Sequence, residues 1–227
     1  AESPEGEVYD AVSMLKDVLT FDKSGSAGGM GEGFKSFASP SYWDARYKKS
    51  EKPYDWYVRW GKLRDLARPD MPLDGGAILN IGCGNSRLAE ELHEEGFRDV
   101  TSVDISSAVI EQMAKRHASL GYRWHEMDAT QMTFPESSFD VIFDKGTLDA
   151  MYSGNHAAVL ATIEEVYRVL RPNGTFFSIT FGDPERRTEL RRSDWASFKT
   201  HQVRATGGAV EEKGSVHYVH VMKKPSA

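Results

Sequence analysis

Residues 77–86 have the sequence Ala-Ile-Leu-Asn-Ile-Gly-Cys-Gly-Asn-Ser, and this stretch decides the fold. Its apolar beginning, residues 77–81, is too short for a core helix and predicts a buried parallel strand. Gly82 and Gly84 allow a tight turn and a close approach to a ligand. The polar pair after them can cap a helix over residues 87–95. A strand, a glycine turn and a helix N-terminus indicate a nucleotide-sized cleft, although such turns can also be purely structural.

Acidic residues follow the next strands of the predicted sheet. Asp104 comes about twenty residues after the turn, where a carboxylate can accept hydrogen bonds from both ribose hydroxyls. Asp128 is placed to accept from an adenine amino group. A single aspartate after a strand can simply cap a loop, but three in succession beside a glycine turn favour a ligand site. The strands and their acids are 99–103 with Asp104, 122–127 with Asp128, and 138–143 with Asp144.

The glycine turn differs from a dinucleotide-binding turn. Three places beyond the second glycine, where such a site has a third glycine, this chain has Arg87. A pyrophosphate cradle is therefore poorly supported. A nucleoside without phosphates fits better, and S-adenosylmethionine is the common one.

Several motifs resemble those of one enzyme family. The chain is similar to class I, seven-strand, S-adenosylmethionine-dependent methyltransferases. The resemblance implies a Rossmann-like α/β fold: a doubly wound, mostly parallel seven-stranded sheet with helices on both faces and an antiparallel C-terminal strand. The motifs are Ile81-Gly-Cys-Gly-Asn-Ser86, Val103-Asp104, Met127-Asp128, Asp140-Val-Ile142 and Leu170-Arg-Pro-Asn-Gly174.

Three further motifs resemble a narrower group, the enzymes that methylate lysines of translation elongation factor 1A, of the type found fused to endothelin-converting enzyme. They are Tyr42-Trp-Asp-Ala-Arg-Tyr47, Tyr54-Asp-Trp56 and Asp144-Lys-Gly-Thr-Leu-Asp-Ala150. The resemblance implies S-adenosylmethionine as cofactor and a protein substrate, with elongation factor 1A as the implied target. Alternatives are a methyltransferase of a small molecule or RNA, and a catalytically silent binding module.

The resemblance also implies the residues of the site. Asp144 and Asp149 are the candidates for orienting a lysine amine, although Asp149 could instead cap the next segment. The aromatic residues before the first strand could pack on the sheet edge or cover the cofactor, and the resemblance favours the cover. The implied cofactor-binding residues are Trp43, Tyr47, Trp56, Gly82, Gly84, Asp104, Ile105, Asp128, Ala129 and Lys145.

Composition bounds the function further. Hydrophobic residues at 40% and charged residues at 27% are typical of a globular protein, and the net charge of −6 gives no pull toward nucleic acid or anionic membrane. The single Cys83 excludes an internal disulfide and suits a reducing compartment. No histidine, cysteine or carboxylate cluster has metal-ligand spacing. We expect a cytoplasmic enzyme without metal, membrane segment or nucleic-acid partner.

The chain divides into two parts. Residues 1–40 form a predicted N-terminal extension, with an amphipathic helix over residues 7–20 and a Gly/Ser-rich linker over residues 23–33. The helix either packs on the domain or binds a partner. Residues 41–227 form the predicted methyltransferase domain.

Weaker patterns complete the predicted domain. Four arginines, Arg186, Arg187, Arg191 and Arg192, form either a solvated polar face or a cationic rim for an acidic protein partner. Helices are predicted over residues 107–119 and 157–170, a turn over 171–174, a strand over 175–181, and an antiparallel pair over 199–206 and 215–222.

Overall fold

The computed structural model describes residues 39–72, 75–152, 155–204 and 216–227. The predicted helix of residues 7–20 and the linker of residues 23–33 lie outside the described residues. The domain boundary at residue 40 therefore stays a prediction. In the part of the chain that is described, no helix is both long and apolar enough to cross a membrane.

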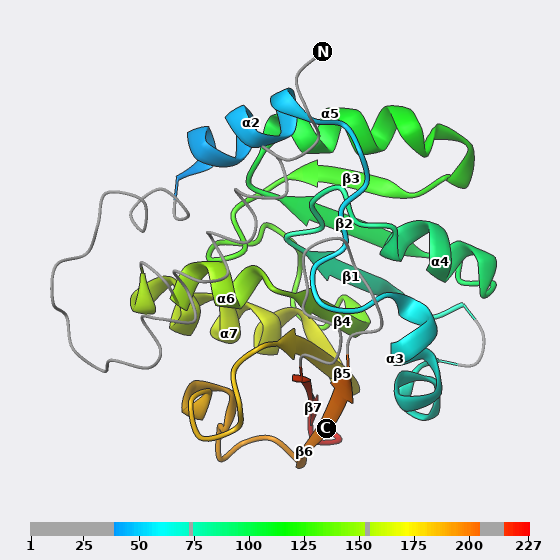
Figure 1. Ribbon diagram of the computed structural model, residues 1–227. Helices are drawn as coiled ribbons and strands as arrows, with labels where there is room; N and C mark the ends of the chain where they lie inside the picture. Colours follow the sequence, from blue (N-terminus) through cyan, green and yellow to red (C-terminus); the bar gives the residue numbers. More distant parts are fainter. Residues whose placement is uncertain (1–38, 73–74, 153–154, 205–215) are drawn as a thin grey trace, which may run out of the picture.

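The centre of the fold is a seven-stranded sheet with the order β3-β2-β1-β4-β5-β7-β6 (Figure 1). Strands β3, β2, β1, β4 and β5 are parallel, and β7 runs antiparallel to both β5 and β6. This confirms the predicted fold class, including the antiparallel C-terminal strand. The strands are β1 (Ile78–Ile81), β2 (Val100–Asp104), β3 (Arg123–Glu126), β4 (Phe139–Lys145), β5 (Leu170–Thr180), β6 (Ser197–Arg204) and β7 (Val216–Lys223).

Side chains alternate between the two faces of the sheet along each strand, so each face carries an apolar core. Helices cover both faces. In β1, Ile78 belongs to one apolar core and the adjacent Leu79 to another. Helices α3 and α4 supply the first core, α6 and α7 supply the second, and α5 packs on β2 and β3 (Figure 1). The helices are α2 (Pro40–Lys49), α3 (Trp60–Ala67), α4 (Leu88–Glu94), α5 (Ser107–Arg116), α6 (Thr147–Tyr152) and α7 (His156–Val169), with 3-10 turns η2 (Arg68–Asp70), η3 (Ala118–Leu120) and η4 (Thr188–Leu190).

Strand register brings the predicted motifs to one edge. Ile81, the last residue of β1, pairs with Val103 of β2 and with Asp144 of β4. The residues that follow these positions, Gly82, Asp104 and Lys145, therefore lie next to one another at the carboxyl edge of the parallel strands. This edge is where open α/β sheets bind their ligands.

The predicted turn at residues 171–174 is the main local difference. Strand β5 already begins at Leu170, which pairs with Phe139 of β4. The register shifts between Phe139 and Val141, and Asn173 has a φ of 63°. Residues 171–174 have no partner on β4, and the pairing resumes at Thr175, which pairs with Val141, so the predicted turn is an irregular bend within β5. The predicted C-terminal antiparallel pair is confirmed by β6 and β7.

Candidate active site

A pocket of about 380 Å³ lies at the carboxyl edge of the parallel strands, and this size is typical of small-molecule sites. Its lining comes from α2 and the segment after it, from the ends of β1 to β4, and from α6 and α7. Every residue predicted to bind the cofactor lines this pocket: Trp43, Tyr47, Trp56, Gly82, Gly84, Asp104, Ile105, Asp128, Ala129 and Lys145. The structure thus collects in one cavity residues that are spread over a hundred positions of sequence. Contact with a cofactor stays a prediction for each.

The two glycines of the turn have different roles. Both have a positive φ, 55° at Gly82 and 50° at Gly84, which favours glycine. A Cβ at Gly82 would lie 2.0 Å from Oγ1 of Thr147, so Gly82 is needed for the packing of α6 and not only for a ligand. A Cβ at Gly84 would lie 2.8 Å from the hydroxyl oxygen of Tyr47, which faces the pocket. Gly84 therefore keeps the turn close to the aromatic wall.

Asp104 is held in place by backbone groups. Its Oδ2 accepts from the Gly84 N–H at 2.9 Å, and its Oδ1 accepts from the Ser106 N–H at 3.0 Å. Burial raises the pKa of Asp104 to about 6, and these hydrogen bonds oppose that rise. The N–H groups of Gly84, Ser106 and Ile105 use three of the roughly four lone-pair sites of a carboxylate, so the fixed Asp104 keeps acceptor capacity for a ribose hydroxyl.

Asp128 also lines the pocket and comes two residues after the end of β3. Its side chain is exposed, and Oδ1 accepts from the Thr130 N–H at 2.8 Å. This local hydrogen bond fixes the side chain, while the second oxygen can accept from an amino group.

The aromatic residues before the first strand, here called the aromatic segment (residues 42–60), form one wall of the pocket. The rings of Trp43 and Tyr47 stack with centroids 6.0 Å apart, as expected for positions i and i+4 of a helix. Asp44, between them, accepts from the Ser106 hydroxyl at 2.5 Å and from the Ala108 N–H at 3.2 Å. Helix α2 is thereby tied to the start of α5. Trp43 and Tyr47 both line the pocket, so these rings form part of its wall in addition to packing on each other.

A buried ion pair joins the aromatic segment to the sheet. Lys145 donates to Asp55 at 3.1 Å and to the Trp56 carbonyl at 3.2 Å. Asp55 also accepts from the Ser86 hydroxyl at 2.6 Å and from the Arg87 N–H. Burial opposes ionisation of Asp55, but attraction to Lys145 and the hydrogen bond from Ser86 outweigh it and lower the pKa of Asp55. Sequence reasoning missed this role of Asp55, although the Tyr54-Asp-Trp56 motif contains it.

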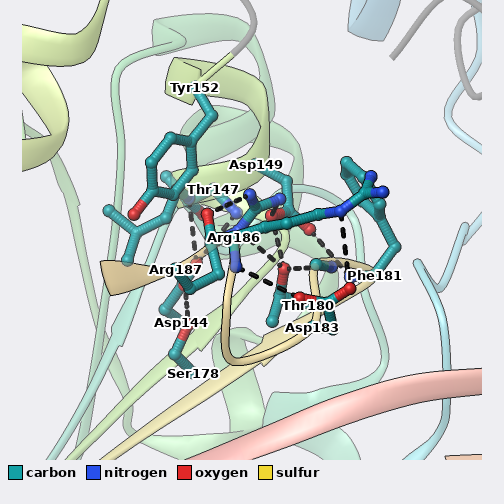
Figure 2. Close-up of polar contacts among 12 residues, drawn as sticks. Asp144, Thr147, Asp149, Tyr152, Ser178, Thr180, Phe181, Asp183, Arg186 and Arg187 are labelled. Carbon is teal, nitrogen blue, oxygen red and sulfur yellow. Dashed lines mark hydrogen bonds and ion pairs between the residues drawn. The ribbon is translucent and has the colours of Figure 1, made fainter. Parts of the chain in front are cut away.

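The two aspartates predicted to orient the substrate lie in different places (Figure 2). Asp144 is fully buried and is not among the residues that line the pocket. It accepts from the N–H groups of Thr147 and Leu148 at the start of α6 and from the Ser178 hydroxyl at 2.7 Å. Burial raises the pKa of Asp144 to about 7, with a contribution from the nearby Asp149. Asp149 does line the pocket, and the orienting role stays a prediction for both aspartates.

The four arginines near residue 190 do not act as one surface. Arg187 is 4% exposed and pairs with Asp149 at 2.8 Å, so neither a solvated face nor a cationic rim describes it. Arg192 is half-buried and pairs with Glu164 and Asp194. Only Arg186 and Arg191 of this group are exposed, and Arg186 forms an ion pair with Asp183. No local pattern indicates that Asp149, 38 positions away along the chain, pairs with Arg187 in the interior.

Comparisons with known proteins agree with this geometry. Residues 79–178 match a family model described as a methyltransferase domain. EEF1A lysine methyltransferase 4 of Bos taurus is 43% identical over 65% of this chain and 62% of its own length. The protein of the same name from Mus musculus is 40% identical over 68% of this chain and 67% of its own length. The matches thus span about two thirds of these relatives.

A solved structure shares the fold. A SAM-dependent methyltransferase from Methanosarcina mazei superposes with a TM-score of 0.58 at 20% identity, covering 77% of this chain and all of that one. This likeness concerns the fold alone. The sequence relatives support a narrower assignment than the fold does, because they are 43% and 40% identical to this chain, compared with 20% for the solved structure. This chain belongs to the methyltransferase family that includes the EEF1A lysine methyltransferases.

Proposed function

We propose that this protein transfers a methyl group from S-adenosylmethionine to a lysine of a protein, with translation elongation factor 1A as the target. One observation carries the proposal: all the residues expected to bind the cofactor line a single pocket. Two relatives named EEF1A lysine methyltransferase 4, at 43% and 40% identity, support the choice of substrate.

The residues of the pocket suit S-adenosylmethionine. Asp104 would accept from the ribose hydroxyls and Asp128 from the adenine amino group, since each has a free carboxylate lone pair. A Cβ at Gly84 would meet the hydroxyl of Tyr47, so a side chain at this turn would crowd the aromatic wall. The faces of Trp43 and Trp56 can attract the positive sulfonium.

When bound, the cofactor supplies an electrophilic methyl group on a positively charged sulfur. The protein's own residues must then hold a nucleophile in line with that group and exclude water. A lysine amine has an ordinary pKa of about 10.4 and attacks only in its neutral form. The pocket wall made by Tyr57, Ala150 and Phe181 is mostly apolar, and desolvation of this kind favours the neutral amine.

Two other functions remain alternatives to the proposal. A methyltransferase of RNA is disfavoured by the net charge of −6 and by the internal ion pairs of Arg187 and Arg192. A silent binding module is disfavoured by the intact Asp104 and its built hydrogen bonds. We propose the cytoplasm as the compartment, because the buried, unpaired Cys83 suits a reducing environment.

The test is a methylation assay with purified elongation factor 1A, labelled S-adenosylmethionine and mass spectrometry of the treated factor. We expect label on a lysine side chain, and no label with an Asp104→Ala variant as the control. Parallel reactions with total RNA and with a small-molecule extract complete the experiment. Label confined to RNA or to metabolites would overturn the lysine assignment.

A further inference from the structure

Asp149 is a buried carboxylate surrounded by four hydrogen-bond donors. Its Oδ1 accepts from the Thr180 hydroxyl at 2.5 Å and from the Arg187 guanidinium at 2.8 Å. Its Oδ2 accepts from the Tyr57 hydroxyl at 2.7 Å and from the Phe181 N–H at 3.2 Å. Two lone pairs on each oxygen are thus matched by two donors. Asp149 lines the pocket, but it has no lone pair left for a substrate amine.

Arg187 neutralises the charge of Asp149 and is itself enclosed (Figure 2). Its guanidinium lies 4.2 Å from the ring centre of Tyr152 and 5.0 Å from that of Phe181. A Cβ at Gly182 would lie 2.3 Å from the guanidinium carbon, so the chain reserves this space for Arg187. Burial opposes the charge of Arg187, but Asp149 outweighs that effect and the pKa of Arg187 is raised. The pair therefore forms a fixed, neutral unit beneath the pocket.

Tyr57 is the member of this cluster that can still interact with a substrate. Its hydroxyl has one proton, and that proton is donated to Asp149. The hydroxyl oxygen therefore keeps acceptor capacity. Burial, with a contribution from Asp149, raises the pKa of Tyr57 well above its ordinary value, so the hydroxyl stays protonated at physiological pH. Tyr57 lines the pocket together with Trp56 and Phe181.

The backbone of Tyr57 is strained. Its φ of 63° is in the left-handed region, which a bulky residue adopts only when its surroundings enforce it. The ring lies between Gly146, where a Cβ would approach it to 3.1 Å, and the ring of His217, 4.8 Å from its centre. Strain of this kind gathers at functional sites. The surroundings thus hold Tyr57 in a strained conformation among the residues that line the pocket.

We propose that the Tyr57 hydroxyl oxygen accepts an N–H hydrogen bond from the neutral substrate amine and so fixes the orientation of its nitrogen. Asp149 and Arg187 are positioning residues that hold the hydroxyl. This inference rests on the proposed lysine methylation. In that reaction the amine nitrogen forms a bond to the methyl carbon as the carbon–sulfur bond of the donor breaks. Sulfur leaves as a neutral thioether, and the methylated ammonium then releases a proton to water.

Tyr57→Phe tests the proposal, because it removes the hydroxyl and keeps the ring between Gly146 and His217. We expect kcat on elongation factor 1A to fall by about tenfold or more, the effect of one lost hydrogen bond to the reacting group. The Kd for S-adenosylhomocysteine should change less than about twofold. The matched control is Tyr122→Phe, which also loses a buried hydrogen bond, from its hydroxyl to the Phe97 carbonyl at 2.7 Å, but does so away from the pocket. We expect its kcat to equal that of the wild type.

Asp149→Asn tests the positioning role. An amide nitrogen in place of Oδ2 would donate to the Tyr57 oxygen and so use the lone pair assigned to the substrate. We expect kcat to fall as in Tyr57→Phe, and the double variant to fall no further, since both changes remove one interaction. A purely structural role of Asp149 would instead give multiplied losses.

The outcomes separate the two proposals. If the wild type leaves the lysines of elongation factor 1A unlabelled, the proposed function is overturned and the role of Tyr57 with it. If the wild type labels a lysine and the folded Tyr57→Phe variant keeps a normal kcat, only the role of Tyr57 is overturned. Tyr57→Phe decides this alone should Asp149→Asn not fold, because removing the carboxylate leaves Arg187 buried without its partner.

Discussion

The ammonium group of Lys145 lies 3.1 Å from the carboxylate of Asp55, and their side chains are only 5% and 8% exposed. This ion pair joins the end of β4 to the aromatic segment, across ninety positions of sequence. Because Asp55 also accepts from Ser86, the pair connects three sides of the pocket. The aromatic wall is therefore held against the sheet by a charge interaction as well as by ring packing.

We predict that Lys145→Met lowers the affinity for S-adenosylhomocysteine by about tenfold or more and lowers the melting temperature, because Asp55 then stays buried without a cation. The double variant Lys145→Met/Asp55→Asn should recover part of both losses, since it removes the unpaired charge as well. Calorimetry and thermal unfolding measure the two effects.

The matched control for that experiment is Arg59→Gln. Arg59 also pairs with Asp55, at 3.6 Å, but its side chain is 60% exposed, so the change should have little effect. A double variant that binds no better than Lys145→Met would mean that Lys145 acts through direct contact with the cofactor and not through Asp55.

The protonation of Asp104 should control cofactor binding. Its pKa of about 6 means that the carboxylate is ionised at pH 7.5 and mostly protonated at pH 5. The ionised form is the better acceptor for ribose hydroxyls, so the affinity for S-adenosylhomocysteine should fall by about tenfold as the pH falls from 7.5 to 5. Calorimetry across this range measures it.

Asp104→Asn separates this effect from general acid instability. At pH 7.5 the variant should bind S-adenosylhomocysteine roughly thirtyfold more weakly than the wild type, which corresponds to about 2 kcal/mol. Its affinity should not change between pH 7 and pH 5. An affinity of the wild type that stays constant over this range would contradict the assignment of Asp104 to the ribose.

Asp144 should make the stability depend on pH. Its pKa is about 7 in the folded protein and near 3.8 when unfolded, so the folded state binds the proton more tightly. The contribution of Asp144 to the free energy of unfolding is fully present below pH 4. It is lost as the pH rises through 7, and the total loss is up to about 4 kcal/mol. Asp144→Asn keeps an acceptor for the N–H groups at the start of α6 and carries no charge. We therefore expect this variant to be more stable than the wild type at pH 8.

Urea unfolding at several pH values between 4 and 8 checks this prediction. The free energy of unfolding of Asp144→Asn should fall less steeply with pH than that of the wild type. Asp65→Asn is the control, since its side chain is 90% exposed and pairs only at the surface. Equal slopes for Asp144→Asn and the wild type would show that Asp144 is not protonated in this range.

The sequence by itself determined the sheet and the contents of the pocket. Short apolar segments and the glycine turn at Gly82 and Gly84 predict parallel strands, and parallel strands bring their carboxyl ends to one edge. Asp104 and Asp128 were predicted from the acids at two such ends, and Lys145, at a third, from the resemblance. They line one pocket because these ends lie side by side. The separate roles of Gly82 and Gly84 were not visible, because Thr147 approaches Gly82 only after α6 has packed.

Only the tertiary structure decided the polar partners within the site. Arg187 is one of four similar arginines, and its burial follows from the position of Asp149 on a helix distant in sequence. Asp144 and Asp149 lie five residues apart in one motif, yet one lies beneath α6 and the other faces the pocket. A buried charge is tolerated only where a partner meets it, and such meetings depend on how elements far apart in the sequence pack together. No local pattern contains that information.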